Sequence, residues 1–248
     1  MLNIEFYVGT ISFLIGEINE LPEYRICRHR GIEVIRGFSG GKRFEYRISS
    51  PKGQEAFKIK ARRDRLMAEL DKFREDLLKY HNVIYEDICS QYVISTKVRH
   101  KFDKRFWDSL GESKSVYEKD NNYYHNDEQF RSRVEVRMSE LLDNLGVRYK
   151  YEVRIKVNGE GYDVDFVIGL LQFNCCFLSE YFGAMERPHR RATSVAKFDN
   201  YSAARIFPGQ DILYLCGTEN MMPSTEVIEE SVCAIINAIS RQHVIRVI

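Results

Sequence analysis

This chain of 248 residues has few prolines and almost no excess of either charge sign. It has only 5 prolines, and its 37 basic and 36 acidic residues leave a formal net charge of +1. Hydrophobic residues make up 44% and charged residues 29%, which is typical of an ordinary folded protein. This composition excludes a disordered tail, a collagen-like chain and a small disulfide scaffold. Near-neutral charge gives no global argument for a polyanionic partner, so any case for nucleic acid must come from local features.

Long apolar runs and paired cysteines are also missing. No window approaches the roughly 18 uninterrupted apolar residues that a membrane span needs. Residues 1–24 have no basic start, and Phe6, Val8 and Thr10 alternate, which favours a strand over a signal peptide. None of the six cysteines belongs to a CxxC pair. Three of them lie in apolar runs: Cys175, Cys176 and Cys216. We therefore expect a cytoplasmic protein with reduced, packed cysteines and no zinc site.

The first 110 residues predict a β-rich part followed by a helical part. Residues 30–38 and 42–50 alternate, and Gly40-Gly41 between them predicts a hairpin turn. From about 58 to 82 the period becomes helical. The apolar residues of this helix step by four, three and four: Leu66, Leu70, Phe73 and Leu77. A further helical or mixed stretch follows to about residue 110.

A polar segment without periodicity, residues 111–127, predicts a linker between an N-terminal part (1–110) and a second domain (128–248). The stretch Tyr117 to Tyr124 within it would suit a protein contact. Residues 125–248 hold 14 basic and 17 acidic residues, a net charge of −3, and the remainder holds 23 and 19, a net charge of +4. Basic runs at 58–65 and 97–105 are either solvated helix faces or contacts to phosphate.

The second domain predicts a mixed β-sheet flanked by helices. The expected elements are a helix at 129–145 ended by Gly146, strands at 148–157 and 162–169 joined at Asn158-Gly159, a strand at 173–183, a helix at 190–204, a strand at 212–218 and a helix at 224–239. The apolar residues expected on the last helix are Val227, Val232, Ile235, Ile236 and Ile239. A last strand would close the chain. The predicted order is α-β-β-β-α-β-α.

Three carboxylates stand at informative places on this framework. Alternation puts Asp163 and Asp165 on one face of their strand, and Glu180 lies within the next apolar strand. A carboxylate there is costly unless it is paired or metal-bound, and two on neighbouring strands indicate a hard divalent cation. Glu135 on the preceding helix adds a third, although it could instead pair with Arg131 at i,i+4. A single such residue is more often a cap or surface residue; the three together favour a metal site.

These residues carry a resemblance that covers Phe130 to about Glu219. The matching pieces, in order, are Arg131-Ser132-Arg133-Val134-Glu135, Val147 to Glu152, Val164-Asp165-Phe166, Glu180 to Met185, Lys197, Tyr201 and Arg205 to Gly209. The stretch resembles the PD-(D/E)XK nuclease superfamily and, more narrowly, a group of uncharacterised bacterial proteins with a nuclease domain of this type. The resemblance implies a restriction-endonuclease-like α-β-β-β-α-β core. The N-terminal β-hairpin and helices resemble the same group more faintly.

The resemblance also implies roles. Asp165 and Glu180 would be the main ligands of Mg²⁺ or Mn²⁺, helped by the backbone carbonyl of Tyr181 and by Glu135. The superfamily lysine normally stands two residues after the glutamate, where this chain has Phe182. We expect Lys197, on the following helix, to replace it. The alternative is that Lys197 is an exposed helix residue and the site is impaired.

The predicted function is hydrolysis of phosphodiester bonds, with DNA as the substrate and no membrane partner. The residues expected to contact phosphate are Arg131, Arg190, Arg191, Lys60, Arg62 and Arg63. Cleavage of both strands of a duplex would suggest a homodimer. The alternative function is that of an impaired nuclease fold that binds nucleic acid or a protein.

Overall fold

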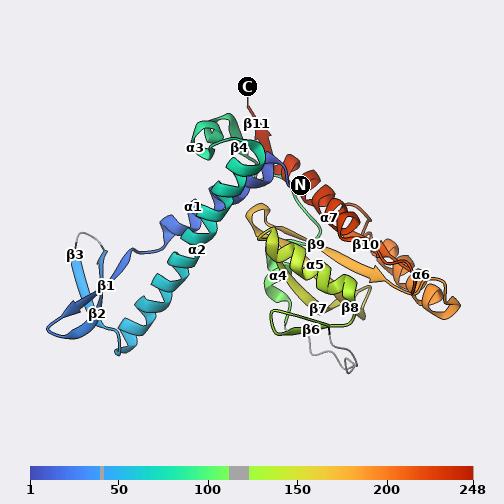
Figure 1. Cartoon of the computed structure of the whole chain (residues 1–248), viewed down its shortest axis with the longest axis horizontal. Helices are drawn as coiled ribbons and strands as arrows, with labels where there is room; N and C mark the ends of the chain where they lie inside the picture. Colours follow the sequence, from blue (N-terminus) through green and yellow to red (C-terminus); the bar gives the residue numbers. More distant parts are fainter. Residues whose placement is uncertain (40–41, 112–122, 248) are drawn as a thin grey trace. The chain divides into compact units, whose positions relative to one another are not determined.

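The computed structural model describes residues 1–39, 42–111 and 123–247 and shows a mixed α/β protein with several sheets (Figure 1). It divides into two compact units. The larger unit comprises Met1–Phe6 and Ile94–Ile245, and the smaller unit comprises Tyr7–Val93 and Arg246–Ile248. Residues 94–110, expected on the N-terminal side of a linker at 111–127, therefore belong to the larger unit. None of the described helices has the length and apolar character needed to cross a bilayer.

The N-terminal segment is a helix, α1 (Ile4–Glu20), and the strand expected there is wrong. Alternation of Phe6, Val8 and Thr10 is too short to decide the period. The longer pattern decides it, because buried residues recur at helical spacing: Tyr7, Ile11, Leu14 and Ile18. Most of α1 belongs to the smaller unit, where Tyr7 meets the ring of Phe73 edge-on with the ring centroids 6.2 Å apart.

Helix α2 (Pro51–His81) begins about seven residues earlier than expected from the apolar stripe. Ser50 caps it by accepting a hydrogen bond from the N–H of Gly53 (3.1 Å), and Pro51 occupies the first turn, where its missing N–H is not needed. A Cβ on Gly53 would stand 1.9 Å from the carbonyl oxygen of Arg47, so only glycine permits this close turn from strand into helix. The expected stripe is buried as predicted: Leu66, Leu70, Phe73 and Leu77.

The β-rich part of the smaller unit is a three-stranded antiparallel sheet. Its strands are β1 (Tyr24–His29), β2 (Ile32–Ser39) and β3 (Lys42–Arg47), in the order β1-β2-β3. Gly40-Gly41, the expected turn, lies outside the described residues, but the strands on either side pair as predicted. The remaining elements before the larger unit are α3 (Tyr85–Ile88), a 3-10 turn (Cys89–Gln91) and β4 (Tyr92–Ile94).

The larger unit contains the expected order of elements. They are α4 (Lys104–Ser109), β5 (Tyr123–His125), β6 (Glu128–Phe130), α5 (Arg133–Asn144), β7 (Arg148–Val157), β8 (Glu160–Leu170), a 3-10 turn (Leu171–Phe173), β9 (Cys175–Phe182), α6 (Pro188–Ala203), β10 (Ile212–Cys216), α7 (Thr225–His243) and β11 (Val244–Arg246). Strands β5 and β6 pair, so residues 123–127 of the expected linker form a hairpin. Most of the Tyr117–Tyr124 stretch lies outside the described residues.

The main sheet has the strand order β10-β9-β8-β7. Strands β7, β8 and β9 form an antiparallel meander, and β10 joins parallel to β9 after the crossover helix α6. The β7–β8 turn has positive φ at Asn158 (51°) and Gly159 (88°), as a tight two-residue hairpin requires. Helix α5 ends before Gly146, which also has positive φ (67°), as predicted.

Two packing expectations need correction. On α7 the buried residue near the start is Ile228, whereas Val227 is 48% exposed, because the helix begins at Thr225 and turns Val227 outward. All six cysteines are free thiols, and Cys175 and Cys176 are buried as expected. Cys216, at the end of β10, is exposed and is not a packing residue.

Candidate functional site

Asp165 and Glu180 face each other across neighbouring strands. The antiparallel β8–β9 ladder ends at the pair of Phe166 with Ser179, and extending its register by one step brings Asp165 level with Glu180. The backbone N–H of Tyr181 donates to Asp165 Oδ2 (2.7 Å), which fixes this carboxylate against β9. The two residues expected to be the main metal ligands are therefore together.

Glu180 is almost fully buried, at 1% exposed, and is surrounded by donors from α6. Lys197 Nζ lies 2.6 Å from Oε1 and 2.7 Å from Oε2, and the hydroxyl of Tyr201 donates to Oε1 (2.6 Å). Lys197 also donates to the carbonyl of Asp163 (2.8 Å). Lys197 and Tyr201 reach the same carboxylate because residues four apart share one face of a helix. With a side chain only 19% exposed, Lys197 is not a solvated helix residue.

Glu135 enters from the first turn of α5. Ser132 caps this helix, and Glu135 Oε2 accepts from the hydroxyl of Tyr151 (2.7 Å) and from the N–H of Arg131 (2.9 Å). The guanidinium of Arg131 forms an ion pair with Glu152. Glu135 is 5% exposed, so it is a buried carboxylate held by neutral donors.

The β-ladder is interrupted at the site. Strands β7 and β8 pair at Tyr151–Phe166 and resume at Val153–Val164, with no bridge between Glu152 and Asp165. Glu152 has a left-handed backbone (φ 48°), an uncommon conformation for a residue with a side chain. Such strain clusters at functional sites. The irregularity lies directly beside the predicted metal ligand.

Burial and neighbouring carboxylates raise the pKa of two acids in this site. The pKa of Asp165 lies well above its ordinary value, first because of burial and then because of the charges of Glu180 and Glu135, with Lys197 acting in the opposite direction. Burial also raises the pKa of Glu180 despite the favourable contact with Lys197. If all three carboxylates are ionised, the site carries more negative charge than its one lysine neutralises.

Two tyrosines were not predicted as site residues. Burial, followed by the adjacent carboxylates, raises the pKa of the Tyr151 and Tyr201 hydroxyls, which keeps both as neutral donors. A third, Tyr214, lies opposite Glu180 in the parallel β9–β10 pair, and its hydroxyl is buried without a hydrogen-bond partner in the described part of the chain. The spacing of Tyr201 from Lys197 was a usable signal. Nothing in the sequence singles out Tyr214.

Most residues expected to contact phosphate have partners within the protein. Lys60 pairs with Asp64 (2.6 Å) and Arg62 with Glu17 (2.6 Å), whereas Arg63 donates to the carbonyls of Ile18 and Leu21 at the end of α1. Arg190 and Arg191, in the first turn of α6, are exposed. Of the expected set, these two arginines are the most accessible to a nucleic acid.

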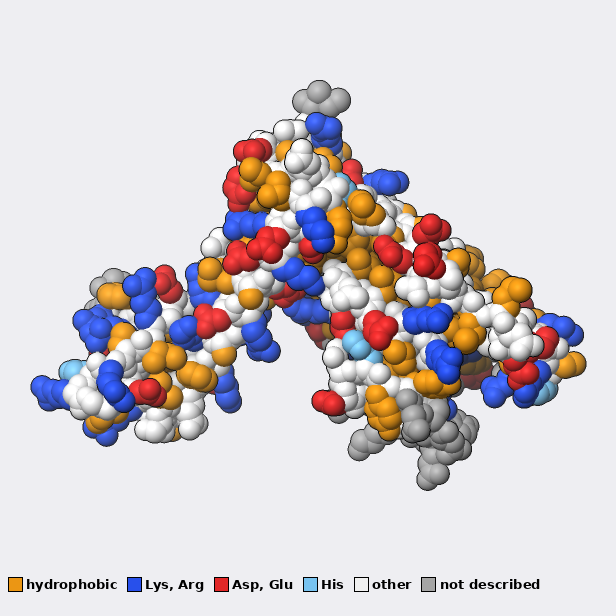
Figure 2. Space-filling model, in the orientation of Figure 1, with side chains coloured by type: hydrophobic (Ala, Val, Ile, Leu, Met, Phe, Trp, Pro, Cys, Tyr) orange, Lys and Arg blue, Asp and Glu red, His pale blue; other side chains and the backbone are white. Residues whose placement is uncertain are grey.

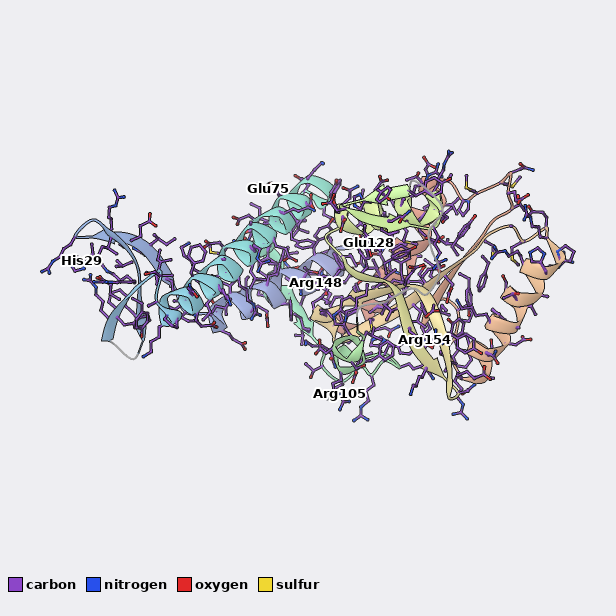
Figure 3. All side chains as sticks on the ribbon, turned by 90° about the horizontal axis from the view of Figure 1, so that it is seen from below. His29, Glu75, Arg105, Glu128, Arg148 and Arg154 are labelled. Atoms are coloured by element: carbon purple, nitrogen blue, oxygen red, sulfur yellow. The ribbon has the colours of Figure 1, made fainter. Side chains whose placement is uncertain are left out.

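A stronger basic surface lies on the sheet of the smaller unit. Residues 24–47, which form this sheet, hold 7 Lys/Arg and 2 Asp/Glu, a net charge of +5. Alternation and the strand register put four arginines on one face of β1–β3, which we call the arginine face: Arg25, Arg36, Arg43 and Arg47. His29 and Glu45 lie on the same face (His29 is labelled in Figure 3), and Lys and Arg side chains gather over this end of the chain (Figure 2).

Glu45 is the only acidic residue on the arginine face among the described residues of the three strands. His29 Nδ1 lies 2.5 Å from its Oε1, Arg36 lies 2.7 Å from its Oε2 and Arg43 lies 3.5 Å away. The contacts with His29 and then with Arg36 lower the pKa of Glu45 to about 2. One carboxylate thus contacts several cationic side chains but does not neutralise them all, so the arginine face keeps a net positive charge.

Comparison with known proteins gives no further assignment. No protein-family model, curated protein or solved structure matches the chain.

Proposed function

We propose that the larger unit is a metal-dependent nuclease with a restriction-endonuclease-like core formed by α5-β7-β8-β9-α6-β10. The observation that supports this most is the position of Asp165 opposite Glu180, with Lys197 contacting Glu180 from the next helix. Glu135 adds a carboxylate from the preceding helix. Buried acids beside one lysine fit phosphodiester hydrolysis, in which an anionic phosphate must approach a charged site.

The donor set suits Mg²⁺ or Mn²⁺. All the donors are hard oxygens, and Asp165 Oδ1 makes no hydrogen bond to the described residues. Asp165, Glu180 and the carbonyl of Tyr181 would hold the ion. Among the described residues, the oxygens of the three carboxylates do not all lie within 4.8 Å of one another, so at least one of the three would have to move or act through a bound water. The ion would supply charge neutralisation and a water of lowered pKa.

The protein's own residues would position the reacting groups. Lys197 would orient the attacking water, since its ammonium is held between Glu180 and the carbonyl of Asp163. Tyr201 would keep Glu180 fixed if Lys197 turns toward phosphate. The ion pair of Arg131 with Glu152 would hold β7 against the segment that precedes α5.

The arginine face would bind the nucleic-acid backbone. Phosphates are recognised by clustered arginines without regard to sequence, and the accumulated positive charge supplies the attraction. DNA is the proposed partner. This assigns binding to the smaller unit and hydrolysis to the larger one, which agrees with the negative charge of the second half of the chain.

The test is a cleavage assay with the full chain on single- and double-stranded DNA and on RNA, in Mg²⁺ and in Mn²⁺. We expect Asp165→Asn to abolish cleavage. Asp163→Asn is the matched control, because Asp163 is on the same strand but is exposed and pairs with Arg154 (3.2 Å; Arg154 is labelled in Figure 3). Failure of the wild-type protein to cut any of these substrates would contradict the proposal.

A second candidate is a nuclease fold that binds without cutting. The observation in its favour is that both oxygens of Glu180 already have partners within the protein. Lys197 contacts both of them, and the hydroxyl of Tyr201 donates to one. DNA binding that weakens steeply with salt, without cleavage and without any effect of Lys197→Met, would support it. Binding of a protein partner would instead be nearly independent of salt.

A further inference from the structure

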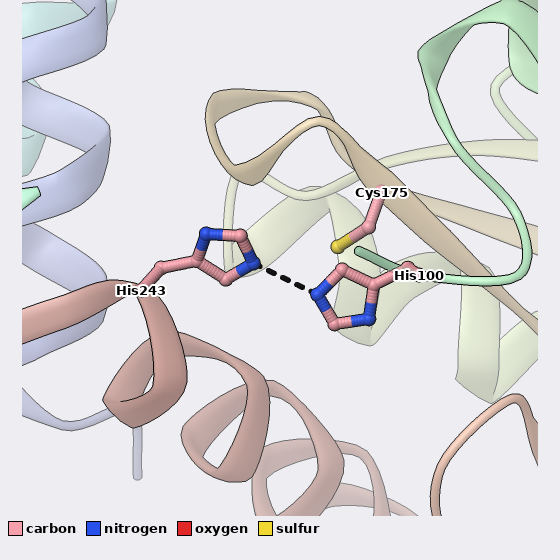
Figure 4. Close-up of side chains that lie close together, drawn as sticks. All are labelled: His100, Cys175 and His243. Carbon is pink, nitrogen blue, oxygen red and sulfur yellow. Dashed lines mark hydrogen bonds between the residues drawn. The ribbon is translucent and has the colours of Figure 1, made fainter. Parts of the chain in front are cut away.

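A group of two histidines and one cysteine lies in the larger unit, away from the carboxylates. His100 Nε2 and His243 Nε2 are 2.8 Å apart, and the ligand atoms of His100, Cys175 and His243 all lie within 4.8 Å of one another (Figure 4). His100 precedes α4, Cys175 is the first residue of β9 and His243 is the last residue of α7. Three separate segments therefore meet at this group.

The orientation of His243 is fixed by its surroundings. Its Nδ1 lies 3.1 Å from the carbonyl oxygen of Ser95, and because a carbonyl only accepts, Nδ1 must carry the proton. Nε2 then presents a lone pair toward His100. The ring also stacks against Phe173 on a centroid distance of 5.1 Å. A histidine whose other nitrogen donates to a carbonyl is the usual arrangement for a metal ligand.

Both imidazoles are ready for a cation at neutral pH. Burial is the first cause that lowers the pKa of His100 and of His243, so neither has to lose a net charge before binding. His243 is 3% exposed and Cys175 is fully buried, whereas His100 is partly exposed. Burial raises the pKa of the Cys175 thiol, so it is protonated when no metal is bound.

We propose that His100, Cys175 and His243 bind one zinc ion. Imidazole nitrogen and thiolate sulfur are the ligands that zinc prefers, and magnesium does not use them. Zinc–nitrogen bonds of about 2.0–2.1 Å set two tetrahedral nitrogens roughly 3.3 Å apart, so the histidines need to separate by only about half an ångström. Water occupies the fourth position, on the side where His100 is accessible.

The proton balance of this step is simple. His100 changes from the tautomer protonated on Nε2 to the one protonated on Nδ1, and His243 keeps its proton. The Cys175 S–H bond breaks as the S–Zn bond forms, and one proton leaves to solvent per ion bound. The affinity therefore rises with pH, as is general when a thiol must ionise to bind a metal.

The zinc site is independent of the proposed nuclease site. Alternation along β9 puts Cys175 and Glu180 on opposite faces of the strand. The ligands also differ in chemistry, with nitrogen and sulfur in one site and oxygen in the other. The expectation of no zinc site rested on the cysteines alone, on their spacing and on their location in apolar runs. It gave no weight to histidines that lie far from Cys175 in the sequence.

Cobalt(II) is the probe, because it substitutes for zinc and gives colour. We expect the chelator-treated full chain to bind one equivalent of Co²⁺, with tetrahedral absorption bands and a thiolate-to-cobalt charge-transfer band that Zn²⁺ abolishes. Zn²⁺ should release one proton per ion and raise the melting temperature. Cys175→Ser should remove the charge-transfer band, and His100→Gln should weaken binding at least tenfold.

Two controls separate this site from others. Cys176→Ser removes the adjacent buried thiol and should leave the band unchanged, and so should Asp165→Asn. Since His100 is partly exposed, His100→Gln provides the test even if Cys175→Ser does not fold. A wild-type protein without the charge-transfer band, an unchanged band in Cys175→Ser, or loss of the band in Asp165→Asn would overturn the proposal. The first result would mean a neutral histidine pair only.

Discussion

The site of Asp165, Glu180 and Glu135 and the arginine face differ in how their charged side chains are buried and paired. Glu180 and Glu135 are almost completely buried, and their hydrogen bonds come from a few specific donors. On the arginine face Arg25, Arg43 and Arg47 are exposed, and the one carboxylate, Glu45, is partly exposed beside its cations. Buried charge demands exact partners and responds strongly to single substitutions, whereas exposed charge acts through its sum and through salt. The substitutions below test that difference.

The largest effect is expected from Asp165→Asn. Loss of a charged ligand should lower the cleavage rate by at least about a hundredfold. Substituting a residue that only supports a metal ligand already lowers activity by up to about that factor. DNA affinity should stay within about threefold, because the arginine face is unchanged. Cleavage and a filter-binding or anisotropy titration measure the two quantities. An equal loss of both would contradict the division of labour.

Lys197→Met should be the most destabilising single change. It leaves Glu180 buried without its cation, and breaking a buried pair costs about 3–5 kcal/mol. Adding Glu180→Gln should recover much of this loss, because the amide is neutral. Denaturant unfolding of the wild type, both single variants and the double variant gives the coupling free energy. Additive losses would show that the two residues do not interact.

Tyr201→Phe and Tyr214→Phe form a matched pair. The first removes a donor to buried Glu180 and should cost about 1–3 kcal/mol. The second removes a buried hydroxyl that has no partner among the described residues, so the free energy of unfolding should stay the same or rise. Both are measured by thermal or denaturant unfolding. Equal losses would indicate that Tyr214 has a hydrogen-bonding role.

Arg43→Gln combined with Arg47→Gln should have a smaller effect that appears in the salt dependence. Each lost phosphate contact lowers the slope of log affinity against log salt by about 0.9, so the pair should lower it by about 2. The cleavage rate at saturating DNA should not change. A slope equal to that of the wild type would remove these arginines from the proposed surface.

The smallest effect concerns the pH dependence of Glu45. Its pKa is lowered to about 2, so the ionised form stabilises the fold above the ordinary carboxylate pKa, and this contribution disappears as the pH falls toward 2. Wild type should therefore melt at a slightly higher temperature than Glu45→Gln at pH 7, and the difference should vanish near pH 2. A difference that persists at low pH would point to packing rather than charge.

The sequence predicts the meander and its acids well, because each depends on local information. Asp165 and Glu180 lie on strands joined by a short turn, and alternation with register is enough to bring them together. The pairing of Arg131 with Glu152 was missed, since it depends on a left-handed residue that no pattern indicates. The helix α1 was missed because three alternating residues outweighed a longer helical period.

Contacts between distant segments could not be predicted from spacing. His100 and His243 are 143 residues apart and meet only when the end of α7 packs beside β9 and the loop before α4. Similarly, the arginine face depends on the strand register, which decides which residues of the three strands share a face. In both cases the sequence contains the residue types, but it does not indicate that they lie close together in the fold.

The β7–β8–β9 meander also determines when the two sites form during folding. Closing a chain over a few residues costs little entropy, whereas contacts across long separations form slowly. Asp165 and Glu180 are fifteen residues apart and belong to adjacent antiparallel strands, so they can be brought together as soon as the meander forms. We expect the histidine–cysteine group to close later, because it also requires α7, which is distant in the sequence. Zinc would therefore bind after the meander has formed. It would lower the rate of unfolding rather than raise the rate of folding.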